Sequence, residues 1–123
     1  MSESERVRFI EHKGSRILYI DFSHSAPDEV LETIEIAERT IAGEPLLSVL
    51  TLTNAEKTMH DRRVAERLKT YIAHNKPYVK AGAVYGLNEL RKIVFNFLNK
   101  ATGRSLKAFD DLAEAKDWLV SKA

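Results

Sequence analysis

The segment HNKPYVKAGAVYGLNELRK, residues 74–92, decides the fold because it contains a helix end, a strand and the start of another helix. Pro77 disfavours helical geometry at the residue before it, so the helix that arrives from the N-terminal side has to end there. Tyr78–Tyr85 then alternates as a strand does, with the small residues AGA (81–83) at its centre. These small side chains allow a helix to pack close to the sheet, although a ligand could also approach the backbone there. Gly86 marks a sharp turn from the strand into the next helix.

The hydrophobic periodicity of the rest of the chain predicts strands that alternate with helices. The expected strands are two within Val7–Ser23, joined at Lys13–Ser15, then Leu46–Thr53, Tyr78–Tyr85 and Ser105–Phe109, and the expected helices are Ser25–Gly43, Asp61–Asn75, Leu87–Thr102 and a last one opened by Asp110-Asp111. The order ββαβαβαβα favours one α/β domain with a five-stranded, mixed but mainly parallel sheet, right-handed crossovers and about four helices. The strand at Leu46–Thr53 is expected to be buried at its start. Residues 7–121 are expected to form the domain, after a frayed or disordered N-terminus at residues 1–6.

Length and composition limit the classes of protein that the chain can represent. With 123 residues, it has the size of one domain. The absence of cysteine excludes disulfides, thiolate metal sites and a cysteine nucleophile, and it fits a reducing compartment. The charged start MSESERVR differs from a secretory signal, and no apolar stretch approaches the roughly 20 residues that span a bilayer. A cytoplasmic protein without a membrane span is expected.

Charge is distributed unevenly along the sequence. Residues 1–60 contain 11 acidic residues and 6 lysines or arginines, whereas residues 61–123 contain 7 and 13. The basic second half could face nucleic acid, phosphate or an acidic partner, or the charges could pair across solvated helix faces. Nucleic acid is not the expected partner, because the sequence contains no nucleic-acid-binding motif.

The sequence contains no recognisable catalytic or metal-binding motif. The four histidines stand in separate loops and element ends without an HExxH pair, so no metal site and no cofactor are predicted. No GxSxG elbow is present. The carboxylate pairs Asp28-Glu29 and Asp110-Asp111 open helices, where the helix dipole explains them. No catalytic residue is assigned, and a binding module is favoured over an enzyme.

Polar residues are predicted to gather at the carboxyl ends of the parallel strands, because these ends share one edge of an open α/β sheet, where ligands usually bind. They are Ser23, Thr53, Asn54, Tyr85, Gly86 and Asn88, with Arg104 nearby. Exposed backbone N–H groups before a helix would favour an anion. The same residues also have local roles, since Asn88 can cap a helix and Thr53 and Asn54 can close a turn. A small apolar or anionic ligand and a purely structural role both remain open.

The helix predicted at Leu87–Thr102 combines a broad apolar stripe with one aromatic residue outside it. At 100° per residue, the stripe contains Leu87, Leu90, Ile93, Val94, Phe97, Leu98 and Ala101. Phe95 lies roughly 130° from the centre of the stripe, beside Arg91 and Lys92. We therefore expect the stripe to face the sheet, and Phe95, Arg91 and Lys92 to form an outer contact surface for a partner protein, a second copy or a lipid surface. A single exposed apolar side chain is also common on protein surfaces.

Four segments of the chain carry a family resemblance. They are KGSRILYIDFS, LLSVLTLT, HNKPYVKAGAVYGL and TGRSLKAFDDLAEAKDWL, and the region they cover extends over about Val7–Val120. Together they resemble the SpoIIAA-like family of small bacterial proteins, which is related to STAS domains and to the lipid-binding CRAL-TRIO fold. The resemblance implies a mixed sheet with helices packed against it. Most members lack an assigned function, so the resemblance concerns the fold more than the task.

The resemblance also implies a candidate modification site. Anti-sigma-factor antagonists of the STAS type are switched by phosphorylation of a serine or threonine at the start of the helix after the third strand. Their motif is similar to Asp-Ser-Ser-Gly, whereas this chain has Thr58-Met59-His60-Asp61. Thr58 is therefore the possible phosphosite, and capping of the helix together with Asp61 is its alternative role. A phosphate there would be stabilised by the helix dipole and by Arg62-Arg63.

Two functional hypotheses follow from these observations. The first is a cytoplasmic, non-enzymatic regulatory module that acts through protein–protein contacts, with a homodimer as one form. The alternative is a carrier or sensor of a small apolar or anionic ligand, held at the rim of the parallel strands.

Overall fold

Five strands form one sheet whose spatial order follows the chain, β1-β2-β3-β4-β5, in the computed structural model, which describes residues 3–123. They are β1 (Val7–His12), β2 (Ser15–Asp21), β3 (Val49–Asn54), β4 (Val79–Tyr85) and β5 (Lys107–Phe109). β1 is antiparallel to β2, and every other neighbouring pair is parallel. The predicted fold class, an α/β domain with a mixed and mainly parallel sheet, is confirmed.

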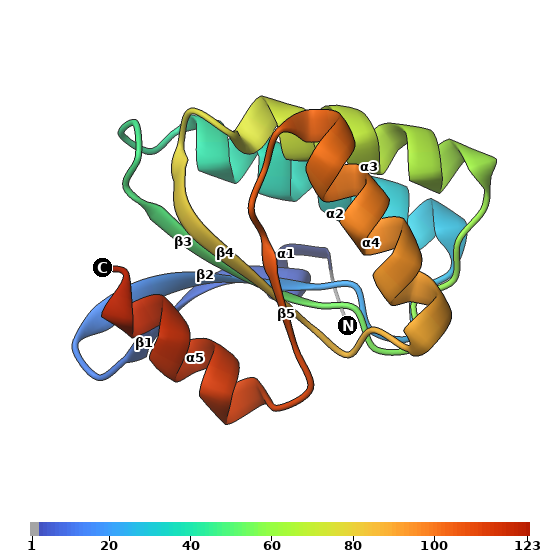
Figure 1. The fold of residues 1–123 in the computed structure, drawn as a ribbon. Helices are drawn as coiled ribbons and strands as arrows, with labels where there is room; N and C mark the ends of the chain where they lie inside the picture. Colours follow the sequence, from blue (N-terminus) through green and yellow to red (C-terminus); the bar gives the residue numbers. More distant parts are fainter. Residues whose placement is uncertain (1–2) are drawn as a thin grey trace.

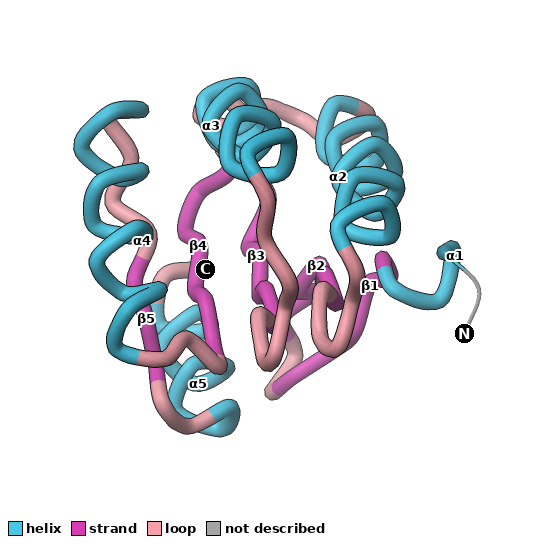
Figure 2. The backbone as a smooth tube through the Cα atoms, turned by 90° about the vertical axis from the view of Figure 1, so that its right-hand side faces the viewer, coloured by secondary structure: helices cyan, strands magenta, loops and turns pink. Residues whose placement is uncertain are grey.

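Helices cover both faces of this sheet. They are α1 (Glu3–Arg6), α2 (Pro27–Ala42), α3 (Arg62–Asn75), α4 (Glu89–Thr102) and α5 (Leu112–Ser121). Figure 2 shows α2, α3 and α4 along one side of the sheet and α5 on the other. Three successive crossovers between parallel strands contain α2, α3 and α4, and crossovers of one hand place their helices on the same side. In both views α4 lies at the β5 end of the sheet (Figure 1, Figure 2).

The small residues at the centre of β4 have different neighbours on the two faces. Ala83 packs with Leu50 and Leu52 of β3 against Ala115 and Leu119 of α5. A helix therefore lies close to the alanine face of β4, as the sequence predicts.

Gly82 lies on the opposite face, toward α3 and α4. A β-carbon at Gly82 would overlap the Leu106 side chain and would stand 2.9 Å from Thr51 Oγ1 and 3.7 Å from Arg104 Nη2. The lack of a side chain at Gly82 therefore allows three side chains, one from β3 and two from the segment before β5, to converge over β4.

The start of the third strand differs from the prediction. Leu46 and Leu47, which were expected to be buried, are 68% and 64% exposed, and β3 begins only at Val49. A register shift between β3 and β4 beside Val49 also places Val79 in the cluster on the α2–α3 side, not on the face of Ala83. Strand alternation does not reveal such a shift, because every residue beyond an irregularity changes face.

A frayed or disordered end was predicted at residues 1–6, of which the structure describes residues 3–6. Residues 3–6 form the single turn α1, and residues 1 and 2 lie outside the described residues. Arg6 Nη1 donates hydrogen bonds to the backbone oxygens of Asp21 at 3.2 Å and Ser23 at 3.1 Å. Arg6 thereby attaches the end of α1 to the end of β2.

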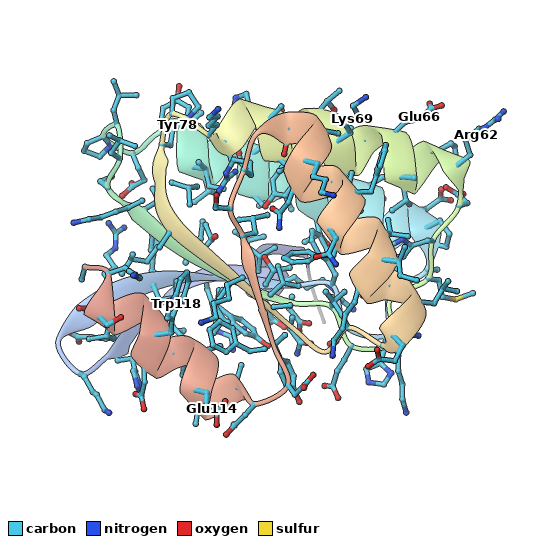
Figure 3. All side chains as sticks on the ribbon, viewed as in Figure 1. Arg62, Glu66, Lys69, Tyr78, Glu114 and Trp118 are labelled. Atoms are coloured by element: carbon cyan, nitrogen blue, oxygen red, sulfur yellow. The ribbon has the colours of Figure 1, made fainter. Side chains whose placement is uncertain are left out.

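The uneven charge distribution corresponds to pairing between neighbouring helices. Arg67 of α3 donates to Glu38 of α2 at 2.9 Å, and this hydrogen bond lowers the pKa of Glu38. Figure 3 shows Arg62, Glu66 and Lys69 on α3 pointing away from the sheet. The charges of α3 thus lie on a solvated face and at its contact with α2.

Candidate functional site

The orientation of α4 overturns the predicted contact surface. Phe95, expected on the outer face, is only 9% exposed and packs with Val84 and Ala55. The physical reason is a pair of hydrogen bonds from Asn99, whose side chain donates to Leu106 O at 2.9 Å and accepts from Leu106 N at 3.1 Å. Residues 95 and 99 are one helical turn apart, so these bonds turn the Phe95 side of α4 toward the sheet.

The opposite side of α4 exposes much of the predicted apolar stripe. The described residues include seven large apolar residues that are exposed, and four of them lie on α4. These four, which we term the α4 apolar face, are Leu90 (71% exposed), Ile93 (68%), Val94 (39%) and Phe97 (62%). Their spacing of three and four residues places them on one side of the helix. Solvent therefore covers a contiguous apolar strip along α4.

The two basic residues of the predicted surface lie beside the core-facing side of α4. Arg91 and Lys92 are both partly buried. Lys92 Nζ contacts Asp110 at 3.2 Å and Glu89 at 3.5 Å. These exposed ion pairs stabilise little on their own, but they occupy Lys92 within the chain.

An open cleft lies at the carboxyl end of β4. Its volume is about 590 Å³, and it is lined by Glu56, Lys57, Tyr85, Gly86, Leu87, Asn88, Arg91 and Asp110. We term it the strand-end cleft. It contains the three rim residues predicted from this part of the chain. Two of these three residues have structural roles. The Asn88 side chain accepts from Arg91 N at 2.8 Å and caps α4. Gly86 packs against the backbone of Glu56.

A second and more enclosed space lies between α3, α4 and the sheet. This buried cavity has a volume of about 100 Å³, and its apolar lining includes Leu68, Ile72, Val84, Phe95, Leu98 and Leu106. Its polar lining includes Thr51, His60 and Arg104, together with Thr53 from the predicted rim. Burial and the charge of Arg91 lower the pKa of His60, which favours the neutral ring.

Arg104 is one of the two arginines, with Arg91, that line the buried cavity. Its Nη1 donates to Ile72 O at 2.8 Å, and its Nη2 faces the space over Gly82. Burial lowers the pKa of the guanidinium, and no carboxylate within residues 3–123 opposes this effect. Sequence reasoning placed Arg104 near the strand rim, but the contact with Ile72 at the end of α3 has no signal in the local sequence.

Ser23 and Asn54 line neither the cleft nor the cavity. Ser23 N donates to the carboxylate of Asp21 at 2.8 Å. Asn54 Nδ2 donates to the Tyr19 hydroxyl at 3.0 Å, and Asn54 Oδ1 accepts from Glu56 N at 3.0 Å. Both residues therefore have the structural roles that were the alternative to ligand binding.

Thr58, the phosphosite implied by the family resemblance, has a buried hydroxyl. The residue is 2% exposed, and Oγ1 donates to Phe22 O at 2.9 Å. Asp61 caps α3 without it, by accepting from Val64 N at 3.0 Å. The Thr58 hydroxyl thus joins the loop after β3 to the end of β2 and is not presented to an enzyme.

From residue 3 onward, no three His, Cys, Asp or Glu side chains gather in a group that could hold a metal ion. Among the helices that the structure describes, none combines the length and apolarity needed to cross a membrane.

Comparison with known proteins identifies the fold. No protein-family model and no curated protein matches the sequence. A solved structure is similar: an uncharacterised protein of the DUF3478 family with a SpoIIAA-like fold, from Shewanella loihica PV-4. Its TM-score is 0.69, with 20% sequence identity, over 92% of this chain and 91% of that one. The chain therefore has a SpoIIAA-like fold, as the sequence resemblance implied.

Proposed function

We propose that this SpoIIAA-like chain is a non-enzymatic regulatory module that acts through protein–protein contact. The α4 apolar face carries the proposal, because exposed apolar side chains on a monomer are usually scattered singly. Contiguous exposed apolar surface commonly marks an interaction site. The absence of cysteine from the sequence supports a cytoplasmic place of action.

Charge complementarity favours a second copy of this chain as the occupant of the α4 apolar face. Glu89 and Lys100 are both exposed. They are about three helical turns apart and therefore flank the same side of the face. In an antiparallel pair of α4 helices about a two-fold axis, Glu89 of each copy approaches Lys100 of the other. Such self-complementary contacts are the commonest form of homo-oligomer.

The same arrangement also matches side-chain sizes. With the axis near the middle of α4, Leu90 of one copy faces the small Ala101 of the other, and Val94 faces Phe97. A helix of 14 residues is about 21 Å long, so the contact belongs to the small interfaces, which bury less than about 1,200 Å². We therefore expect a reversible dimer with a dissociation constant of roughly 10⁻⁶–10⁻⁴ M.

Replacing both Ile93 and Phe97 with serine is expected to abolish this dimer while leaving the monomer folded, because both side chains are largely exposed. Sedimentation velocity should show a sedimentation coefficient that rises with concentration for the wild type and stays at the monomer value for the double variant. The matched control is Leu46→Ser, which removes an equally exposed leucine outside α4 and should dimerise as the wild type does. A wild type that stays monomeric into the millimolar range, or a control that loses the dimer equally, would contradict the proposal.

A carrier or sensor of a small apolar or anionic ligand is the second candidate function. The buried cavity favours it, because the cavity is more enclosed than the strand-end cleft, is largely apolar, and includes two of the predicted rim residues, Thr53 and Arg104. Small-molecule sites commonly combine an apolar lining with a few placed polar groups. The strand-end cleft supports this function less, because Gly86 and Asn88 already have structural roles there.

A further inference from the structure

We infer that the buried cavity binds a short aliphatic carboxylate, with its carboxylate paired to Arg104 and its tail among the apolar side chains under α4. This inference rests on the second candidate function and specifies its ligand. It does not require the dimer, because only Val94 of the α4 apolar face lines the cavity.

The state of Arg104 indicates an anionic ligand group. A guanidinium carries five N–H donors and is charged at every physiological pH. Arg104 donates one hydrogen bond from its guanidinium, to Ile72 O. Burial lowers the pKa of the guanidinium, and no carboxylate within residues 3–123 offsets this effect. Arg104 is partly buried, and a charge in an apolar setting is usually paired with an opposite charge. A carboxylate is the complementary anion, since it accepts two hydrogen bonds from the guanidinium fork.

The surroundings of Arg104 provide a second group for the same carboxylate. Arg104 Nη2 and Thr51 Oγ1 both lie within 3.7 Å of the point where a β-carbon of Gly82 would stand. The Leu106 side chain fills that point, so a carboxylate that accepts from the guanidinium and from the hydroxyl together has to displace Leu106. Arg104 and Thr51 both line the buried cavity.

The size of the buried cavity restricts the tail of the ligand. An apolar cavity of about 150 Å³ holds one benzene molecule, and drug-sized ligands occupy roughly 300–1,000 Å³. A space of about 100 Å³ accommodates a tail of about four carbon atoms on the same scale. Butyrate and isovalerate fit this limit, whereas a long-chain fatty acid would require α4 to move.

Butyrate and its uncharged isostere butyramide test the inference directly. We expect butyrate to bind with a dissociation constant on the order of 10⁻⁴ M, given the ceiling on affinity per atom of small ligands. In methyl NMR spectra it should shift the signals of Ile72, Val84, Leu98 and Leu106, which line the cavity. Butyramide should bind at least tenfold more weakly, because hydrogen bonds to charged groups are the stronger ones.

Two variants separate the role of the charge from that of the fold. Arg104→Met should weaken butyrate binding at least tenfold and leave butyramide binding within about twofold of the wild type. Thr51→Val, which keeps the side-chain shape, should weaken butyrate binding severalfold, and it provides the test if loss of the bond to Ile72 O unfolds the first variant.

Each outcome of this experiment is decisive. Equal binding of butyrate and butyramide, unaffected by either substitution, would overturn the carboxylate inference and leave the cavity as an apolar ligand site. The absence of any methyl shift with both compounds at ten millimolar would overturn the inference and the ligand-binding function together.

Discussion

Replacing Gly86 with alanine is expected to lower the free energy of unfolding by about 3 kcal/mol, from backbone strain and overpacking combined. Gly86 has a φ of +90°, and a β-carbon there would stand 2.8 Å from Glu56 N and 3.0 Å from Glu56 Cα. Backbone atoms cannot rotate away as the end of a side chain can. The substitution therefore has to separate the turn after β4 from the loop after β3.

Gly14 provides a matched control for the strain alone. Its φ of +83° is nearly the same, but no heavy atom lies within 4 Å of the position that a β-carbon would take. Gly14→Ala is expected to cost only about 1 kcal/mol. Urea unfolding of both variants measures the difference, and equal losses of stability would show that close approach to Glu56 does not explain Gly86.

The close approach to Glu56 explains why a glycine stands at this turn. A glycine at the end of a parallel strand is compatible with a ligand that approaches the backbone or with a close contact inside the chain. The contact with Glu56 supports the second explanation. Gly86 thus shapes one wall of the strand-end cleft as a consequence of packing.

The second large effect is expected for Thr58→Glu, which should destabilise the protein by about 3–5 kcal/mol, the range for a buried charge without a partner. The hydroxyl of Thr58 is buried and donates to Phe22 O. A glutamate would place a negatively charged carboxylate beside the carbonyl oxygen of Phe22, and the two would repel each other. The larger glutamate side chain would also have to fit into the space that a threonine occupies. Thermal and urea unfolding measure the loss.

Thr58→Val separates the hydrogen bond from the charge. It keeps the side-chain shape and leaves Phe22 O without its donor, at an expected cost of about 1–2 kcal/mol. If Thr58→Glu instead has the stability of the wild type, the site tolerates negative charge, and a phosphorylation switch of the STAS type becomes the better explanation of this loop.

Most of the fold could be predicted from local pattern. The strand period of two and the helix period of 3.6 give the order of elements, and the preference of successive strands for neighbouring positions agrees with the observed sheet order. The start of β3 was placed wrongly and α1 was not predicted, because a register shift beside Val49 and the bonds of Arg6 to the end of β2 are tertiary features.

The orientation of α4 could not be predicted because the helix is apolar on two sides. The side of the helix with Leu90 and Phe97 contains more apolar residues than the side with Phe95, so periodicity predicts that it faces the core. In the structure, Phe95 faces the core instead. The deciding contacts are the two hydrogen bonds between Asn99 and Leu106. They join different elements, so only the folded chain reveals them.

Only part of the candidate site could be predicted, because some of its contacts also join different elements. Tyr85, Gly86 and Asn88 line one cleft because they are neighbours in the sequence, whereas the predicted rim residues Ser23, Thr53 and Asn54 do not line it. The buried cavity depends on the absent side chain of Gly82 and on the reach of Arg104 to the end of α3. Such a space is defined by three elements at once, and no spacing in the sequence encodes it.

The most direct test of the central claim, that the α4 apolar face is covered by a second copy in solution, is a disulfide trap. The chain has no cysteine, so Val94→Cys introduces a single thiol close to the expected two-fold axis, and Leu46→Cys is the exposed control outside α4. Under mild oxidation at micromolar concentration, Val94→Cys should form a covalent dimer many times faster than Leu46→Cys. Equal rates for the two variants would contradict the pairing of α4 and, with it, the proposed function.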